Sequence, residues 1–413
     1  MNRIRNALLA LWRDQRGLAL PLALLALLVL VAQSSALLVV GSSEIQIAAN
    51  LRASTQALFL AEAGLEDAFN TIRNTPSLIT SAPASLTVMT ALSGSGKMGS
   101  FGSYSVQYQS AGPNTVLVVA TGMAGAAQKT LRATLSTQFT TNDAFRTNGD
   151  LTISGNPTFT GACGKAHTNR DLTISGSPSF AGTVTAAGSY AGDPTLGQGG
   201  QIKKMVPTIG PATFLASAQQ TLPASQIFQM KSLSLGPTSM GLVLDGAGLL
   251  ITTLTEGQSY RGWKYSSGTP ASWDYNDSTA NDGTYYFEGN AKVSGSPGSN
   301  ATPWKTTILS TGNIEVSGKP TMSSHLTDTL LVAGQDITIT GNPTQSASGI
   351  IVAHEQIKIS GKPTIQGYLV AENATSTGNT VVEDVLTGTL TITFDCGLTP
   401  PLQGPLQILA WGL

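Results

Sequence analysis

The spacing of hydrophobic residues changes twice along the chain. Residues 18–40 form an unbroken apolar run without a charged side chain, and residues 41–73 carry apolar positions at helical intervals. Beyond them, short stretches alternate between apolar and polar residues and are separated by Gly and Pro. Because alternation is typical of strands, the pattern predicts a long N-terminal helix followed by β structure.

The apolar run 18–40 predicts a membrane-spanning helix. At ~1.5 Å per residue it is roughly 34 Å long, enough to cross a bilayer core of ~30 Å. Arginines dominate the segment before it, against a single acid: Arg3, Arg5, Arg13 and Arg16, with Asp14. The positive-inside rule therefore leaves the N-terminus in the cytoplasm, and we expect a single-pass protein whose remaining mass lies outside.

An apolar stripe continues beyond this run. Leu or Ile recurs every seven residues, at Leu51, Leu58, Leu65 and Ile72, which places these side chains on one helix face. Pro76 is expected to end the helix, near residue 73. The stripe can pack on a sheet of the same chain or on helices of other subunits, and we expect both at different heights.

Three alternating stretches follow the helix, at 104–108, 116–121 and 131–135. Gly-rich turns separate them, which favours an antiparallel meander. We therefore expect an α+β domain at about 18–140, with the helix packed on this small sheet.

A repeat begins after residue 145. Its consensus is apolar-x-apolar-Ser/Thr-Gly-x-Pro, and its copies lie at 150–157, 171–178, 291–297, 314–320, 337–343 and 357–363. Adjacent copies are 20 to 23 residues apart, with one long gap. A period of this size, with short strands in each unit, predicts an all-β solenoid (parallel β-helix) at 145–395. We expect an insertion at about 190–288 and a C-terminal tail at 396–413.

Composition excludes several kinds of partner and site. Charged residues make up 11% of the chain and the net charge is -1, which is too little charge for nucleic acid. Cys163 and Cys396 are too isolated for a metal site and form either one disulfide or two buried free thiols. We expect neither a metal nor a cofactor.

An aromatic stretch with nearby acids is the candidate ligand site. Trp263, Trp273, Asp274 and Tyr275 fall within a few residues of one another in the expected insertion. Aromatic rings beside carboxylates suit a sugar-binding platform or a calcium loop. The alternative is a loop whose aromatic residues form a small satellite core over the solenoid flank.

Catalysis is not expected. Glycoside hydrolysis needs two facing carboxylates about 5–9 Å apart. The repeats offer acids only at strand starts, as at Asp150 and Asp171, where Asp is a common turn residue. We find neither a Gly-x-Ser-x-Gly elbow nor a phosphate-binding loop. A polysaccharide-active β-helix enzyme is therefore the third choice of function, and we assign no catalytic residue.

The N-terminus resembles that of a known class of protein. Arg16-Gly17 directly before an apolar run resembles the prepilin cleavage site. This resemblance implies a leader at 1–17, cleavage by prepilin peptidase between Gly17 and Leu18, and N-methylation of Leu18. An ordinary signal peptidase would instead cut beside small residues after the apolar segment, near Ser34-Ser35-Ala36.

The helix beyond the membrane strengthens the resemblance. An Asn-Leu-Arg step at Leu51 and a run of six residues resemble the family named for the pilus-assembly protein PilX; the run is Ala61, Glu62, Ala63, Gly64, Leu65 and Glu66. The resemblance implies a pilin-like fold, other pilins as partners, and a bacterial inner-membrane protein with a periplasmic C-terminal domain that reaches a pilus or the cell surface. Major pilins carry Glu at the position of Leu22, so its absence here suggests a tip or rare subunit.

The repeats resemble right-handed β-helices and the solenoids of bactofilins. Together the two resemblances imply a minor pilin of a type IV pilus that displays a β-helix for adhesion, tip or priming roles, with surface polysaccharide as one candidate partner. The second choice is a membrane-anchored periplasmic or surface binding protein that uses the pilin pathway only for export.

Overall fold

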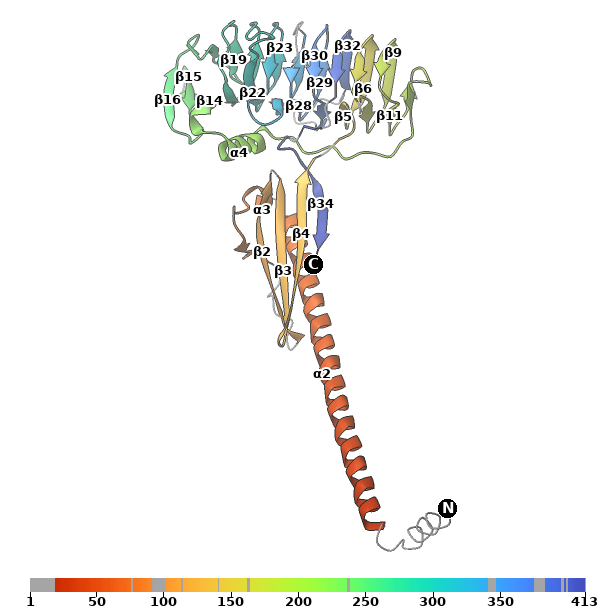
Figure 1. The fold of residues 1–413 in the computed structure, drawn as a ribbon. Coiled ribbons are helices and arrows are strands. Elements are labelled where there is room, and N and C mark those ends of the chain that lie inside the picture. Colours follow the sequence, from red (N-terminus) through yellow and green to blue (C-terminus); the bar gives the residue numbers. More distant parts are fainter. Residues whose placement is uncertain are drawn as a thin grey trace.

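The computed structural model describes residues 19–75, 77–90, 92, 101–112, 114–139, 141–161, 164–235, 238–340, 347–374, 383–394, 397–398 and 400–412. A long helix rises to an antiparallel sheet, and a broad stack of parallel strands lies across the far end of that sheet (Figure 1). The expected order of a long N-terminal helix and then a large β-rich region with parallel sheets is confirmed. We call the two parts the stalk domain and the coil domain.

Helix α2 (Ala19–Asn74) has 56 residues. Its apolar side chains are exposed from Leu20 to Val40, and burial starts only at Ala57. Among the described residues it is the one helix long and apolar enough to cross a membrane. The hydroxyls of Ser34 and Ser35 donate to the carbonyls of Leu30 and Ala32, so these polar groups are satisfied within the helix.

The upper part of α2 packs against a five-stranded antiparallel sheet. The short helix α3 (Ser77–Thr80) leads into it, and its strands, in spatial order, are β1 (Thr87–Val88), β2 (Ser103–Gly112), β3 (Thr115–Ala124), β4 (Ala127–Gln138) and β34 (Gln403–Gly412). Small residues let the helix approach closely. A Cβ added to Gly122 would lie 2.1 Å from the carbonyl oxygen of Ala57.

The last strand of this sheet corrects one expectation. Residues 396–413 were expected to form a tail, but Gln403–Gly412 is β34, which pairs antiparallel with β4. The coil domain is therefore inserted between two neighbouring strands of the stalk sheet rather than appended to it. Figure 1 shows β34 returning beside β4 toward α2.

The coil domain consists of chain turns whose strands lie on three faces. The first face contains β5 (Phe145–Thr147), β8 (Ala166–Thr168), β11 (Val184–Ala186), β13 (Gly197–Gln198), β14 (Ile227–Leu235), β15 (Thr238–Leu244), β16 (Leu250–Leu254), β20 (Gly283–Phe287), β22 (Trp304–Ser310), β25 (Thr329–Ala333), β28 (Ile350–Ala353) and β31 (Leu369–Ala371). The second contains β6 (Asp150–Gly155), β9 (Leu172–Gly176), β12 (Tyr190–Ala191), β17 (Ser259–Tyr260), β18 (Trp263–Ser266), β19 (Ser272–Tyr275), β21 (Asn290–Val293), β23 (Ile314–Val316), β26 (Ile337–Ile339), β29 (Ile357–Ile359) and β32 (Glu383–Gly388). The third contains β7 (Thr158–Thr160), β10 (Ser179–Phe180), the start of β22, β24 (Met322–Ser323), β27 (Ala347–Ser348), β30 (Thr364–Gln366) and β33 (Thr391–Thr393).

Every repeat copy places its strand on the second face. The strands pair in parallel with equivalent residues in register, so Ile314, Ile337 and Ile357 form one buried ladder. The repeat glycine serves this stacking: Gly176 has φ +93°, and a Cβ there would lie 2.2 Å from the carbonyl oxygen of Gly155 in the next turn. The glycine and proline of the copy at 337–343 lie outside the described residues.

The order of turns in space differs from their order in the sequence. The chain enters in the middle, and β5, β6 and β7 begin turns that build toward one end. Residues 199–210 then cross back and lead into α4 (Pro211–Thr221) and the short 3-10 helix η2 (Ala224–Gln226). The remaining turns return from the far end until β31, β32 and β33 pair with β5, β6 and β7. We call this junction the seam.

The expected insertion at 190–288 is thus mostly part of the stack. Residues 190–198 complete the first turns, and β14 pairs in parallel with β20. The antiparallel strands β15, β16, β17 and β18 flank these turns at the far end. The crossing segment, α4 and η2 lie outside the three faces.

A buried carboxyl group lies at the seam. Asp384 of β32 accepts hydrogen bonds from Thr147 of β5 and from the backbone N–H of Ile357. Asn373 also donates to Asp384, and its amide oxygen is a second partner of the Thr147 hydroxyl. The Thr147 hydroxyl has one proton and cannot donate it to both Asn373 and Asp384, so a proton on Asp384 completes the network. Burial raises the pKa of Asp384 to about 7, despite the opposing hydrogen bonds from Thr147, Ile357 and Asn373.

We predict that Asp384 makes the coil domain less stable as the pH rises. The pKa in the fold is about 7 against an ordinary 3.8, so between these values the folded chain holds a proton that the unfolded chain has released. The melting temperature should fall from about pH 4 to about pH 7 and level off above. Asp384→Asn, which imitates the protonated group, should flatten this slope and raise the melting temperature at pH 8. An unchanged slope would contradict the assignment.

We also predict that Gly122→Ala destabilises the stalk domain by about 1–3 kcal/mol, because the added methyl group meets helix backbone that cannot move alone. Thermal unfolding of the full chain in detergent measures this. Gly412→Ala is the control, since nothing lies within 4 Å of a Cβ at that position. Equal melting temperatures for the two variants would show that the helix and the sheet are not in close contact.

Candidate functional site

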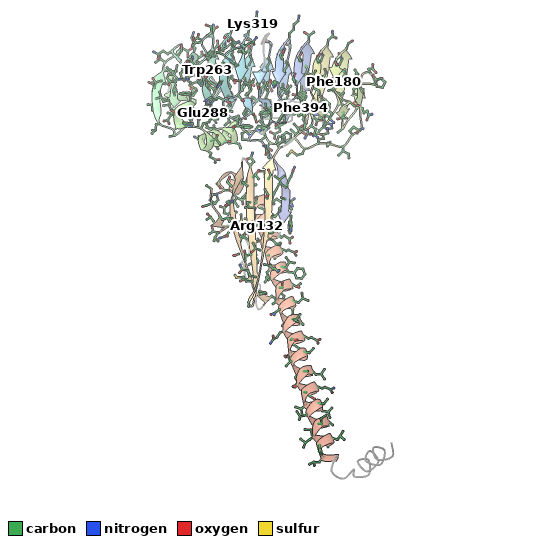
Figure 2. The ribbon with its side chains drawn as sticks, in the orientation of Figure 1. Arg132, Phe180, Trp263, Glu288, Lys319 and Phe394 are labelled. Atoms are coloured by element: carbon green, nitrogen blue, oxygen red, sulfur yellow. The ribbon has the colours of Figure 1, made fainter. Side chains whose placement is uncertain are left out.

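The aromatic stretch is not a ligand site. Trp263, Trp273 and Tyr275 are fully buried in the main core of the coil domain, where Trp263 packs against Phe287 at 4.5 Å between ring centroids. Figure 2 shows Trp263 within the stack of strands. Asp274 is half-buried and accepts a hydrogen bond from Ser294 at 2.7 Å. The sugar platform and the satellite core are both wrong, because these rings fill the interior of the terminal turns.

Four other expected site residues lie outside the part of the chain that the structure describes. Gly17, Leu18, Cys163 and Cys396 are not among the described residues, so the cleavage site and the disulfide stay predictions. Within the described ranges, no group of three or more His, Cys, Asp and Glu side chains could hold a metal ion, so Asp274 belongs to no such group.

The crossing segment 199–210 is held on the coil domain by charged and polar groups. Asp143 is fully buried and accepts from the guanidinium of Arg146 at 2.7 Å and from the ammonium of Lys204 at 2.8 Å. Farther along, the N–H of Ile209 donates to Glu372 at 2.7 Å. Because these groups pair with one another, we assign them the structural role of holding the crossing segment on the coil domain rather than a reactive role.

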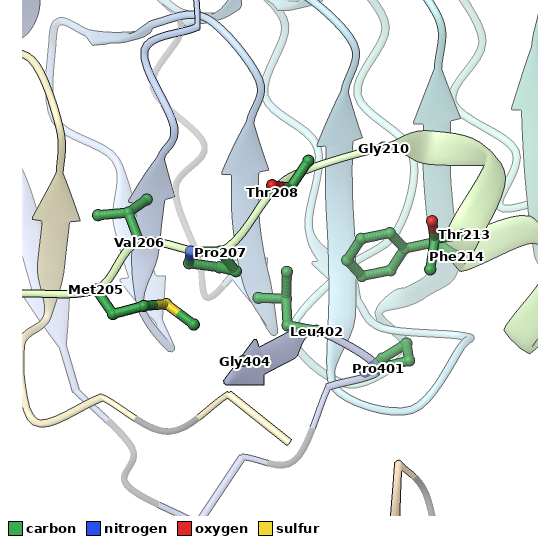
Figure 3. Close-up of a pocket in the computed structure, with 10 residues that line it drawn as sticks. All are labelled: Met205, Val206, Pro207, Thr208, Gly210, Thr213, Phe214, Pro401, Leu402 and Gly404. Carbon is green, nitrogen blue, oxygen red and sulfur yellow. The ribbon is translucent and has the colours of Figure 1, made fainter. Parts of the chain in front are cut away.

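A hollow of about 450 Å³ lies where the two domains join. The crossing segment and the chain leading to β34 form its walls (Figure 3); its lining residues are Met205, Val206, Pro207, Thr208, Gly210, Thr213, Phe214, Pro401, Leu402 and Gly404. None of these side chains titrates near neutral pH, so the lining offers no acid, base or nucleophile beyond threonine hydroxyls. Its chemistry suits packing between the domains.

A second groove lies between α2 and β34, with a volume of about 330 Å³. Its lining combines the helix motif with the last strand: Glu62, Leu65, Glu66, Phe69, Ala133, Leu135, Ile408 and Trp411. The floor is apolar, and the two exposed glutamates come from α2. We call it the α2–β34 groove and take it as the candidate interaction site.

The six-residue helix motif has two structural roles. Ala61 and Leu65 are buried against the sheet. Gly64 makes room for Tyr104, whose ring would lie 3.0 Å from an added Cβ and whose hydroxyl donates to Asp67 at 3.0 Å. Ala63 is half-buried, and Glu62 and Glu66 face the solvent. The small and apolar members therefore seat the helix, while the acids remain available.

The groove exists because the helix covers only part of the sheet. Strands lie about 4.8 Å apart and a helix is ~10 Å wide, so one helix shields about two strands. The register pairs Ile408 with Leu135 and Trp411 with Ala133, which places both on the face that α2 covers elsewhere. Ile408 and Trp411 nevertheless remain 51% and 55% exposed. Sequence reasoning missed them because it treated their segment as a tail.

The lower part of α2 is a further exposed apolar surface. Leu51, the first residue of the heptad stripe, is 67% exposed, whereas Leu65 and Ile72 are buried in the stalk domain. The stripe thus packs on the chain's own sheet only in its upper part. From Leu20 to Gln56 no residue of the helix is fully buried.

Two of the solved structures that resemble this chain have only a weak likeness to it. No protein-family model and no curated protein matches the chain. The competence-associated pilin ComZ from Thermus thermophilus is 12% identical, with a TM-score of 0.30 over 87% of this chain and 97% of that one. The DUF3494 domain of ice-binding protein 1 from Shewanella frigidimarina is 14% identical, with a TM-score of 0.24 over 61% of this chain and 94% of that one. TM-scores this low support no argument about this chain.

Proposed function

We propose that the chain is a minor-pilin-like subunit of a type IV pilus or a related assembly. Prepilin peptidase cuts after Gly17, Leu18 is methylated, and α2 holds the protein in the inner membrane with the coil domain in the periplasm. The subunit then joins a filament through α2. The coil domain is a β-solenoid that the filament displays for an adhesive, tip or priming role.

One observation carries this proposal: α2 is a single helix with two different environments. From Leu20 to about residue 56 its apolar side chains have no cover, and from Ala57 it is packed on the sheet. A bare apolar helix of this length needs a membrane or other helices around it. The coil domain lies at the opposite end of the stalk, which suits display away from a membrane or filament core (Figure 1).

We further propose that the coil domain acts by contact and not by catalysis. Its interior is filled by ladders of Ile, Val and Leu, and two of its buried acids, Asp143 and Asp384, have partners within the fold. Surface polysaccharide remains one candidate partner. The second function, a surface binding protein that uses the pilin pathway only for export, has the same anchor and differs in whether α2 enters a filament.

We predict that the mature chain is found in sheared filaments and begins at methylated Leu18, as mass spectrometry of the filament fraction can show. Gly17→Leu should leave the leader in place and keep the chain in the membrane fraction, because the side chain blocks the cut. Wild-type chain confined to membranes would favour the export-only function. A mature start at Leu37 would refute pilin processing.

A further inference from the structure

The helix layer that covers the stalk sheet is incomplete at the α2–β34 groove. The floor of the groove, from Leu135 to Ile408 and Trp411, continues the sheet face that α2 covers over the neighbouring strands. A second helix beside α2 would complete that layer, since the uncovered width is that of one or two strands. We propose that this helix is segment 45–59 of α2 from a second copy of the chain; one face of this segment is exposed, while Ala57 on its other face is buried on the sheet. The proposal rests on the proposed function, in which α2 packs with other subunits.

Charge identifies the occupant. Glu62 and Glu66 line the groove, and neither has an ion-pair or hydrogen-bond partner in the part of the chain that the structure describes. Apolar side chains with two free carboxylates suit an apolar helix that carries a cation. In α2 the only cations are Arg52 and Arg73, and Arg52 lies in segment 45–59.

The residues around Arg52 have the required pattern. Ile45 and Phe59 lie seven residues before and after it, so all three fall on one face of the helix. Ile45 and Phe59 are exposed, which gives an apolar–cation–apolar stripe that the molecule itself does not cover. At about 100° per residue, this stripe points roughly 180° away from Ala61, which is buried on the sheet.

The stripe and the groove face in different directions and lie at different heights. Glu62 is about 100° around the helix from Ala61, so one molecule presents its groove to the side and its stripe to the rear. Arg52 lies 10 to 14 residues below the two glutamates in the sequence, which is roughly 15–21 Å along a helix at ~1.5 Å per residue. Contact between non-equivalent surfaces joins copies head to tail, as in a ring or a filament, and does not form a two-fold symmetric dimer.

Charge reversal tests this contact. Two differently tagged copies of the full chain are co-expressed, and their co-purification from detergent-solubilised membranes is measured. Arg52→Glu alone, or Glu62→Arg with Glu66→Arg, places like charges together and should reduce co-purification at least about tenfold. The triple variant with all three changes should restore it, as should co-expression of the two reversed forms, because each then meets an opposite charge.

Matched variants make the outcome decisive. Arg73→Glu reverses the other cation of α2 and should leave co-purification unchanged. Trp411→Ser should weaken it without a change of charge. The proposal is overturned if the triple variant co-purifies as poorly as either reversed form alone, or if the wild-type chain does not self-associate. It is also overturned if the groove reversal reduces co-purification and Arg52→Glu does not, because that result indicates a different partner. Wild-type chain in sheared filaments together with any of these results leaves the proposed function standing and removes only the groove contact.

Discussion

The pairing of β4 with β34 is the interaction on which the rest of the structure depends. It joins strands that are separated by the whole coil domain and brings both ends of that domain to one edge of the stalk sheet. The backbone N–H of Phe139 donates to the carbonyl of Leu402 at 2.9 Å, so the two connections are tied where they leave the sheet. A domain held by two chains is constrained in orientation far more than one on a single linker.

At the seam, the coil domain also depends on pairing between strands that are far apart in the sequence. The first and last turns are not neighbours in sequence, yet β5, β6 and β7 each pair in parallel with a strand from the last turns. Asp384, Thr147 and Asn373 form a buried polar network at this junction. Such a network is costly when incomplete, so it favours one register of closure over alternatives.

The sequence predicted those features whose information is local. The heptad from Leu51 to Ile72 predicted the helix. The repeat period predicted parallel turns, because every copy has the same residue types at the positions that stack. The order of the turns was not predictable, since it depends on contacts between residues such as Thr147 and Asp384 far apart in the chain. Strand β32 departs from the consensus at two positions, with Asp384 in place of the first apolar residue and Leu390 in place of the proline, so no local pattern marks it as a copy.

The candidate sites show the same limit. Aromatic residues near acids predicted a surface patch, yet Trp263 and Tyr265 alternate with Lys264, a pattern that places both rings on one side of a strand, and both are buried. In the α2–β34 groove, Ala133 and Leu135 pair with residues 278 and 273 positions later in the chain, which no local pattern reveals.

Hydrogen–deuterium exchange of the segment 403–412 in the full-length protein tests the central claim most directly. Pairing of β34 with β4 predicts amides in this segment that are protected well beyond the exchange time of an open chain, with protection lost together with that of β4 on unfolding. Exchange of the whole segment at the rate of an unstructured tail, while β3 and β4 stay protected, would contradict the inserted arrangement of the coil domain.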